Sequence, residues 1–317
     1  MAGLGVYVSI VQPSLLQTLS LMLIFGLFAI GFDFAFGFSG MHSFGHAAMF
    51  GGGGYMAAYF LKEITTLAPV VLLVATVTGI VLALLLGFLG SRTEGIYFAM
   101  ITLASAQIMY ILVFQDVFAT ILGRDSVTGG DNGIFGIPRM TVPGLDLEGS
   151  MLQFYLITLV LAAVGALLLF RIANSRFGSI LRAVQQNEER VAHLGYDVRK
   201  YKLIGFAISG GISGLAGGLL VSLQGIAHPG SLLNWIVSGD IIFMTLLGGM
   251  GTLWGPMLGA GLYIYIQESL HWFPQWRLLL AGIFIVVIIF FPAGLAGVLR
   301  SADSLYSWFR ARLFDRE

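Results

Sequence analysis

The sequence predicts an all-α polytopic membrane protein with about 8–10 transmembrane helices. Of the 317 residues, 57% are hydrophobic and only 10% are charged, whereas soluble domains carry about 25% charged residues. The mean hydropathy is +0.91. The apolar runs are long, unbroken and rich in Leu, Ile and Ala, while strands of a membrane β-barrel alternate apolar and polar residues. Membrane-spanning helices therefore account for most of the chain.

Nine apolar runs are candidate spans, and they set the order of the elements. They cover residues 15–37, 41–61, 67–89, 95–122, 152–171, 202–224, 236–250, 254–270 and 278–299. The second, seventh and eighth runs are short or interrupted by Gly and Pro. Irregular backbone within a membrane is tolerated only where protein or a watery cavity covers it. These three runs therefore predict interrupted or re-entrant helices.

Basic residues are concentrated in two segments, which predicts their side of the membrane. Seven of the sixteen Lys and Arg lie within 171–202, and four more follow the last span. Because cytoplasmic loops carry an excess of Lys and Arg, we expect segment 172–201 and the tail 301–317 to be cytoplasmic. The loop 123–150 carries two Arg and four acidic residues and is expected on the opposite side.

Composition and motifs exclude several functions. Acidic and basic residues balance at sixteen each, so no basic surface indicates a nucleic-acid partner. There is no cysteine, and the four glycines at 51–54 are not followed by the Lys-Ser/Thr of a phosphate-binding loop. No His, Asp and Glu spacing is typical of a metal site, and Ser43 with His46 lacks the paired acid and oxyanion hole of a hydrolase. We expect no cofactor and no catalytic residues.

A faint internal repeat predicts two related halves, about 15–171 and 202–300, within a single membrane domain. Residues 40–44 (GMHSF) resemble residues 249–253 (GMGTL), and a glycine-rich block follows each of them. The matched residues of these blocks are Gly51, Gly53 and Tyr55 in one and Gly259, Gly261 and Tyr263 in the other. Duplicated halves with interrupted helices are common in transporters. The clustered glycines favour either unwound backbone that contacts a solute or close packing alone.

The polar segment 174–202 carries the pattern of a folded helix. Apolar residues at helical spacing predict one amphipathic helix over 179–194, with these residues on one face: Ile180, Leu181, Val184, Val191 and Leu194. Gly195 stands where a left-handed cap is expected, and Asp197 is placed to cap the next helix. The polar group at 187–190 then lies mid-helix on the exposed face. This pattern favours a docking element over an ordinary solvated loop.

Six sequence blocks, in order along nearly the whole chain, carry a family resemblance. They are GFSGMHSFGHAAMFGGGGY (37–55), GIYFAMITLASAQI (95–108), VTGGDNGI (127–134), the segment from SRFGSILRAVQQNEER to GLAGGLL (175–220), SGDIIFMTLLGGMGTLWGPMLGAG (238–261) and FFPAGLAGVL (290–299). Together they resemble the LivM-type permeases of branched-chain amino-acid ABC importers.

This resemblance implies partners and a location in the bacterial inner membrane. Such permeases pair with a sister subunit of the LivH type or with a second copy, and two cytoplasmic ATP-binding subunits drive them. A periplasmic solute-binding protein delivers the solute. The segment matching 176–201 implies a helix that couples to the ATPases, with these candidate residues: Arg182, Asn187, Glu188, Glu189, Arg190 and Gly195. Relatives carry branched-chain amino acids, urea, amides or aromatic carboxylates, which leaves the solute open.

Polar residues within the predicted spans are candidates for a translocation pathway. An Asp at the centre of a membrane helix costs of order 3 kcal/mol, so it needs a reason to be there. For His46 a packing role, hydrogen-bonded to a carbonyl, is at least as well supported as contact with solute. The candidate pathway residues are Asp33, His42, Ser43, His46, Gln107, Asp240 and Thr252.

The leading hypothesis is a translocation subunit driven by ATP that separate subunits hydrolyse. The alternative is an ion-coupled secondary transporter of a small polar solute, which would use Asp33 or Asp240 as its ion site. The folded basic segment 172–201 favours the first, because a self-sufficient transporter does not require it. A membrane-embedded enzyme is disfavoured, since no nucleophile, paired acid or metal constellation is present.

Overall fold

A computed structural model describes residues 13–90, 93, 95–144, 147, 149–270, 275, 278–282 and 294–297. Most of the ninth predicted span and the whole tail 301–317 lie outside the described residues. The elements are α2 (Pro13–Asp33), the π-helix η1 (Phe34–Phe38), α3 (His46–Glu63), α4 (Ala68–Gly90), α5 (Gly95–Phe114), α6 (Val117–Leu122), β1 (Ile134–Phe135), α7 (Met151–Ala173), α8 (Arg176–Gln186), α9 (Glu188–His193), α10 (Val198–Gln224), β2 (Ile226–Ala227), α11 (Pro229–Leu232), α12 (Trp235–Gly248) and α13 (Trp254–Leu270).

The predicted all-α membrane fold is confirmed. Six helical segments of the described chain are long and apolar enough to cross a membrane: Ser14–Phe38, Ala68–Gly90, Gly95–Phe114, Met151–Ala173, Val198–Gln224 and Pro229–Gly248. The strands β1 and β2 are two residues each and pair antiparallel. They tie the loop after α6 to the end of α10.

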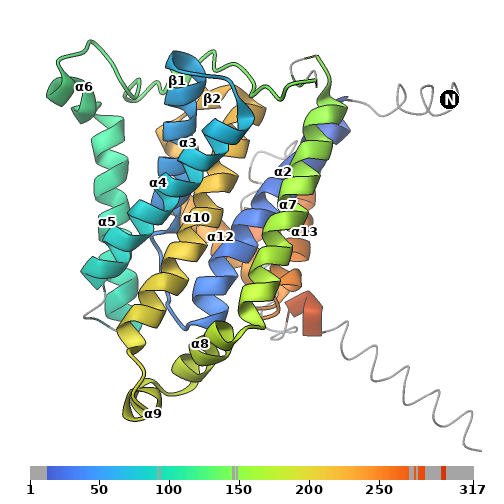
Figure 1. Ribbon diagram of the computed structural model, residues 1–317. Coiled ribbons are helices and arrows are strands. Elements are labelled where there is room, and N and C mark those ends of the chain that lie inside the picture. Colours follow the sequence, from blue (N-terminus) through green and yellow to red (C-terminus); the bar gives the residue numbers. More distant parts are fainter. Residues whose placement is uncertain are drawn as a thin grey trace, which may run out of the picture.

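The helices form an upright bundle with α10 near its centre (Figure 1). The short helices α8 and α9 lie at one end of the bundle, which we call the α8–α9 end. At the opposite end, the β1–β2 end, lie α6 and the two strands. Helices α5 and α7 lie at the periphery, and large apolar side chains cover their outer faces, as expected for surfaces in contact with lipid or another membrane subunit.

Glycines allow α3 and α4 to approach α10 closely. A Cβ added to Gly53 of α3 would lie 2.5 Å from the Cα of Gly214 in α10. A Cβ added to Gly79 of α4 would lie 2.1 Å from the carbonyl oxygen of Gly210. Such contacts leave no room for a side chain, which is how small residues let membrane helices associate. The glycines at 51–54 lie within continuous helix, so close packing explains them.

Two irregular segments interrupt the helices inside the bundle. After η1 the backbone is irregular through residues 39–45, where Gly40 has a φ of +67°, and α3 begins at His46. After α12 the backbone is irregular at 249–253, where Gly249 has a φ of +107°, and α13 begins at Trp254. These segments hold the two pentapeptides matched in the sequence. In the segment 249–253 clustered glycines do occur in irregular backbone, whereas the glycines at 51–54 lie within a continuous helix.

The prediction of one helix over 179–194 was wrong. The helix breaks at Asn187, whose backbone is extended with φ −162° and ψ 104°. The Asn187 side chain accepts a hydrogen bond from the backbone N–H of Arg190 at 2.9 Å and so caps α9. Because the chain changes direction here, Leu194 does not join the apolar face and is 75% exposed.

The predicted span 95–122 is also divided. Helix α5 ends at Phe114, and Asp116 adopts the left-handed conformation with φ 49° before α6 begins. Asp is one of the few residues other than Gly that adopt this conformation readily. The membrane-spanning part of this run is therefore shorter than its apolar length suggests.

Candidate functional site

Helices α8 and α9 pack on the bundle through a small apolar face. Leu181, Val184 and Val191 are buried, and Leu181 lies against Gly205 of α10, where an added Cβ would meet its Cδ1 at 3.2 Å. The turn into α10 is formed as predicted. Gly195 has a φ of +88°, and the side chain of Asp197 accepts a hydrogen bond from the backbone N–H of Lys200 at 3.2 Å.

Two predicted coupling residues face the bundle instead of the exterior. The Arg182 guanidinium donates a hydrogen bond to the carbonyl of Ala173 at 3.0 Å and lies 5.7 Å from the ring centre of Phe38. The carboxylate of Glu188 pairs with the ammonium of Lys202 on α10. Of the other predicted coupling residues, four are exposed: Asn187, Glu189, Arg190 and Gly195.

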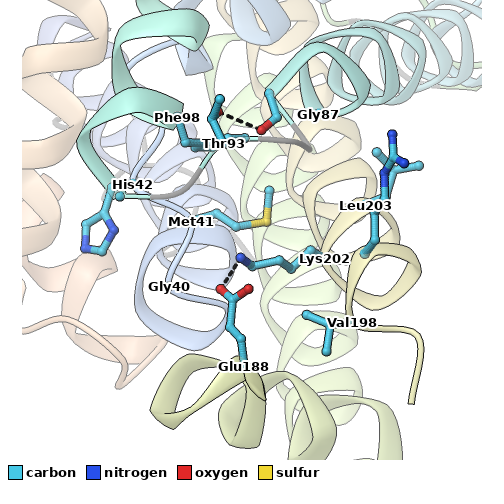
Figure 2. A pocket seen from close by; sticks show the side chains of 13 residues that line it. Gly40, Met41, His42, Gly87, Thr93, Phe98, Glu188, Val198, Lys202 and Leu203 are labelled. Atoms are coloured by element: carbon cyan, nitrogen blue, oxygen red, sulfur yellow. Dashed lines mark hydrogen bonds and ion pairs between the residues drawn. The ribbon is translucent and has the colours of Figure 1, made fainter. Parts of the chain in front are cut away.

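A cavity of about 230 Å³ lies beside this ion pair, between α9, the first turns of α10 and the turn from α4 to α5. In Figure 2 the Lys202 and Glu188 side chains meet at one wall, with Met41 directly above them and Phe98 and Thr93 further up. We call helices α8 and α9 together the α8–α9 module. Because Met41 belongs to the first irregular segment and Glu188 to α9, the cavity lies between this module and that segment.

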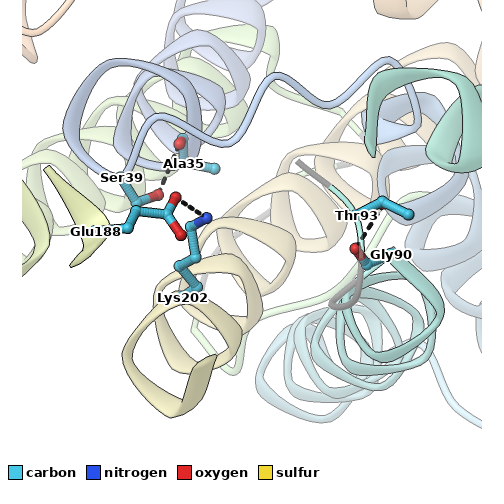
Figure 3. Close-up of polar contacts among 6 residues, drawn as sticks. All are labelled: Ala35, Ser39, Gly90, Thr93, Glu188 and Lys202. Carbon is cyan, nitrogen blue, oxygen red and sulfur yellow. Dashed lines mark hydrogen bonds and ion pairs between the residues drawn. The ribbon is translucent and has the colours of Figure 1, made fainter. Parts of the chain in front are cut away.

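Two hydroxyl groups near this cavity donate hydrogen bonds to backbone carbonyls at the ends of helices (Figure 3). Thr93 Oγ1 donates a hydrogen bond to the carbonyl of Gly90 at 2.9 Å, at the end of α4. Ser39 Oγ donates to the carbonyl of Ala35 at 2.7 Å, at the end of η1. The two carbonyls, which would otherwise lack a partner at a helix end, are thus hydrogen-bonded, and Gly90 and Thr93 both line the cavity.

Three hydroxyls satisfy the backbone N–H groups at the start of α3. Gly45 N–H donates to Ser43 Oγ at 3.1 Å, within the irregular segment. The other two acceptors come from different helices. Phe44 N–H donates to Thr102 Oγ1 of α5 at 3.1 Å, and Ala47 N–H donates to Ser238 Oγ of α12 at 3.0 Å. An unpaired N–H inside a membrane costs several kcal/mol, so these contacts hold the irregular segment in place.

His46, the first residue of α3, is fully buried and joins three helices. Its Nε2 lies 2.9 Å from Ser209 Oγ of α10, and that hydroxyl donates to the carbonyl of Gly31 in α2 at 2.6 Å. Since the hydroxyl proton is used, we assign the imidazole proton to Nε2. The rings of Phe32 and Phe206 meet the imidazole edge-on. This arrangement is that of a packing residue.

Asp33 and Thr252 hold the second irregular segment. The Asp33 carboxylate, fully buried, accepts hydrogen bonds from Gly251 N–H at 2.8 Å and Leu253 N–H at 3.1 Å. Thr252 Oγ1 accepts from Gly255 N–H at 3.1 Å in the first turn of α13. Thr252 thus accepts from an N–H of its following helix, whereas Ser43, at the position that the sequence comparison aligned with Thr252, accepts from Gly45 N–H just before α3.

The other three candidate pathway residues are only partly covered. Asp240 of α12 accepts a hydrogen bond from the Tyr263 hydroxyl at 2.7 Å. Gln107 lies half-buried on α5, and His42 is exposed, with its ring edge-on to Phe36 at 4.7 Å between centres. His42 also lines a second cavity at the α8–α9 end, of about 390 Å³, together with Arg182.

Four residues of the site were missed from the sequence: Thr102, Lys202, Ser209 and Ser238. In the sequence, Lys202 served only to assign segment 171–202 to one side of the membrane. Its ion-pair partner Glu188 lies 14 residues away, across a turn, and could not be recognised. The hydroxyls lie on faces rich in small residues, where close packing is a sufficient reason for a Ser. The described residues contain no group of three His, Cys, Asp or Glu that could hold a metal ion.

Interrupted helices inside a polytopic bundle, with a folded polar element at one end, are typical of membrane transport proteins. The chain belongs to the family of branched-chain amino acid transport system permease components, whose sequence model matches residues 14–290. The predicted resemblance to LivM-type permeases is confirmed.

Curated relatives of two permease types match the chain. The high-affinity branched-chain amino acid transport system permease protein LivM of Escherichia coli K12 is 28% identical over 308 residues, covering 89% of this chain and 69% of the relative. The high-affinity branched-chain amino acid transport system permease protein BraD of Pseudomonas aeruginosa is 25% identical over 86% of this chain and 91% of its own. LivH of Escherichia coli K12 is also 25% identical, with the same coverage. No solved structure matches the chain.

Proposed function

We propose that the chain is the permease subunit of an ATP-driven importer in a bacterial inner membrane. It forms the translocation pathway for a branched-chain or similar hydrophobic amino acid that a periplasmic binding protein delivers. Its partners are a LivH-like sister subunit or a second copy and two cytoplasmic ATP-binding subunits. Membership of the permease family supports this proposal, as do the names of the relatives, which are branched-chain amino acid transport permeases.

The α8–α9 module is the observation that carries the coupling role. It is folded and capped, and its apolar residues rest on the bundle. Glu189 and Arg190 remain exposed on the far side. We place this end in the cytoplasm, because it holds most of the basic residues between the predicted spans. The exposed pair is then available to an ATP-binding subunit.

Helix α10 is the route from this module to the interrupted helices. The Glu188–Lys202 pair and the Asp197 cap join its first turns to α9 and the turn after it. Further along, Ser209 contacts His46 at the start of α3 and Gly31 of α2. A movement of the module would therefore reach the segment 39–45 through one helix of 27 residues. ATP binding would favour one of two states by contacting the module differently in each.

The candidate pathway residues then have two roles. Asp33, Ser43, His46 and Thr252 hold the irregular segments through hydrogen bonds, so we assign them to positioning. Asp240, Gln107 and His42 are only partly covered or exposed, and we assign them to contact with the solute. Asp240, Gln107 and His42 are therefore the residues whose substitution should first be tested for an effect on transport.

Charge reversal at the exposed pair tests the coupling role. In the complex reconstituted into vesicles, Glu189→Arg with Arg190→Glu should abolish ATP-dependent leucine uptake while the permease stays inserted. Glu63→Arg reverses an exposed charge at the end of α3, at the opposite end of the bundle, and should leave uptake unchanged. Normal uptake by the double variant would refute the coupling role. Uptake by the chain alone, driven by an ion gradient without nucleotide, would instead establish the secondary transporter.

A further inference from the structure

The cavity beside the Glu188–Lys202 ion pair combines charged groups of both signs with an apolar wall, and Arg199 is a second cation in its lining. The side chains of Lys202 and Glu188 are 20% and 34% exposed, so both are partly withdrawn from solvent. Met41 and Phe98 are buried in the opposite wall, and Leu203 lies beside Lys202. Figure 2 shows these groups around one space. Of the two ion pairs among the described residues, this one joins separate helices, whereas Asp197 and Lys200 are three residues apart.

We propose that this cavity is a binding site for a zwitterionic α-amino acid with a short apolar side chain. The ammonium of such a ligand would pair with Glu188, its carboxylate with Lys202, and its side chain would lie against Met41 and Phe98. The ligand would exchange one ion pair for two charge-assisted contacts. The inference deepens the proposed function and rests on it, since it places a site for the transported class of solute at the cytoplasmic end.

The size and lining of the cavity suit this ligand class. Its volume is about 230 Å³, below the roughly 300–1,000 Å³ of pockets for drug-sized ligands, so a single amino acid fits where a peptide does not. The opposite charges of Glu188 and Lys202 favour a zwitterion over an anion or a cation, because either single charge would leave one of the two without a partner. Arg199 also lines the cavity, and its guanidinium lies 5.5 Å from the ring centre of Phe88. Occupancy would also separate α9 from α10, so accumulated solute would act on the coupling module.

Binding of three related molecules to the full-length chain in detergent tests the site. L-leucine carries both charges, L-leucinamide lacks the carboxylate, and 4-methylpentanoate lacks the ammonium. We expect L-leucine to bind at least about tenfold more tightly than either analogue, since each loses one charge-assisted contact. Equal binding of all three molecules, or no binding of L-leucine, would overturn the proposal.

Two variants locate the binding in this cavity. Glu188→Gln should remove the preference for L-leucine over 4-methylpentanoate, and Lys202→Met should remove the preference over L-leucinamide. Misfolding would lower all three affinities and would not abolish one preference selectively. Glu189→Gln, an exposed carboxylate on the same helix, should change neither preference. Retention of both preferences in the first two variants would exclude the site. Uncoupling by the Glu189 and Arg190 reversals would still support the permease function in that case.

Discussion

Asp33 and Gly251 are 218 residues apart, and a hydrogen bond of 2.8 Å joins the carboxylate of the first to the backbone N–H of the second. The reverse contact also exists, because Ser238 of α12 accepts from the N–H of Ala47 at the start of α3. Helix α2 thus provides an acceptor for the second irregular segment, and α12 provides one for the helix that follows the first. A displacement of either helix would therefore change the hydrogen bonds of the other half.

Replacement of Asp33 by Asn should destabilise the fold. The two carboxylate oxygens accept from Gly251 and Leu253, whereas an Asn side chain has only one acceptor oxygen. One buried N–H would lose its partner, at a cost of about 1–3 kcal/mol. Thermal unfolding of the purified protein in detergent measures the loss. Asp240→Asn is the control, because an amide oxygen can still accept from Tyr263; equal losses in both variants would contradict this account.

Glycine positions that the repeat aligns should differ in their tolerance of a methyl group. Gly53→Ala places a Cβ 2.5 Å from the backbone of Gly214 and should cost about 1–3 kcal/mol of stability by overpacking. Gly261→Ala meets nothing within 4 Å and should be neutral or slightly stabilising, because Ala is the better helix former. Unfolding midpoints of the two variants test this difference, and a tolerant Gly53 would show that α3 and α10 can separate.

The loop at 126–128 should loosen at low pH. Desolvation raises the pKa of Asp116, but hydrogen bonds from Ser126, Val127 and Thr128 outweigh it and lower the pKa from 3.8 to about 2. A carboxyl with a lowered pKa in the folded state stabilises that state above the unfolded pKa. This contribution should persist above about pH 4 and disappear between pH 4 and 2.

Hydrogen exchange of the backbone amides of Val127 and Thr128 measures this effect. Asp116→Asn keeps a residue suited to the left-handed backbone but removes the charge, so its exchange rates should show no added loss of protection between pH 4 and 2. A wild-type loop that is equally protected at pH 2 and pH 5 would disprove the role of the charge.

Asp240→Asn should alter transport without uncoupling ATP hydrolysis. If Asp240 contacts the amino acid, loss of its charge should raise the KM for leucine uptake by about tenfold, the effect of one charge-assisted hydrogen bond. ATPase activity stimulated by the loaded binding protein should persist at saturating solute. Asp131→Asn in the exposed loop is the matched control. Unchanged uptake kinetics in Asp240→Asn would remove Asp240 from the pathway.

The sequence was sufficient for features that depend on local patterning. Apolar run length placed the spans, and Gly195 and Asp197 marked the turn into α10, because left-handed glycine and side-chain capping act within a few residues. The family resemblance was readable for the same reason, since its blocks are contiguous.

Features that depend on tertiary partners were not predictable. The break at Asn187 competes with a helical pattern that continues through it, and the adjacent Glu188 pairs with Lys202, which lies 14 residues further along the chain. The inward orientation of Arg182 depends on Phe38 and the end of α7. Asp33 was interpreted as a pathway residue because an acid within a membrane span is costly and is expected to have a function. The N–H group that it accepts from belongs to Gly251, more than 200 residues further along the chain.

The hydroxyl supports of α3 impose an order on biosynthesis. Ser238 and Ser209 leave the ribosome long after segment 39–45, yet the start of α3 relies on both. Until α12 is inserted, the Ala47 N–H in the first turn of α3 lacks its Ser238 acceptor, and lipid offers none. The amino-terminal half therefore completes its hydrogen bonds only after translation of the carboxy-terminal half.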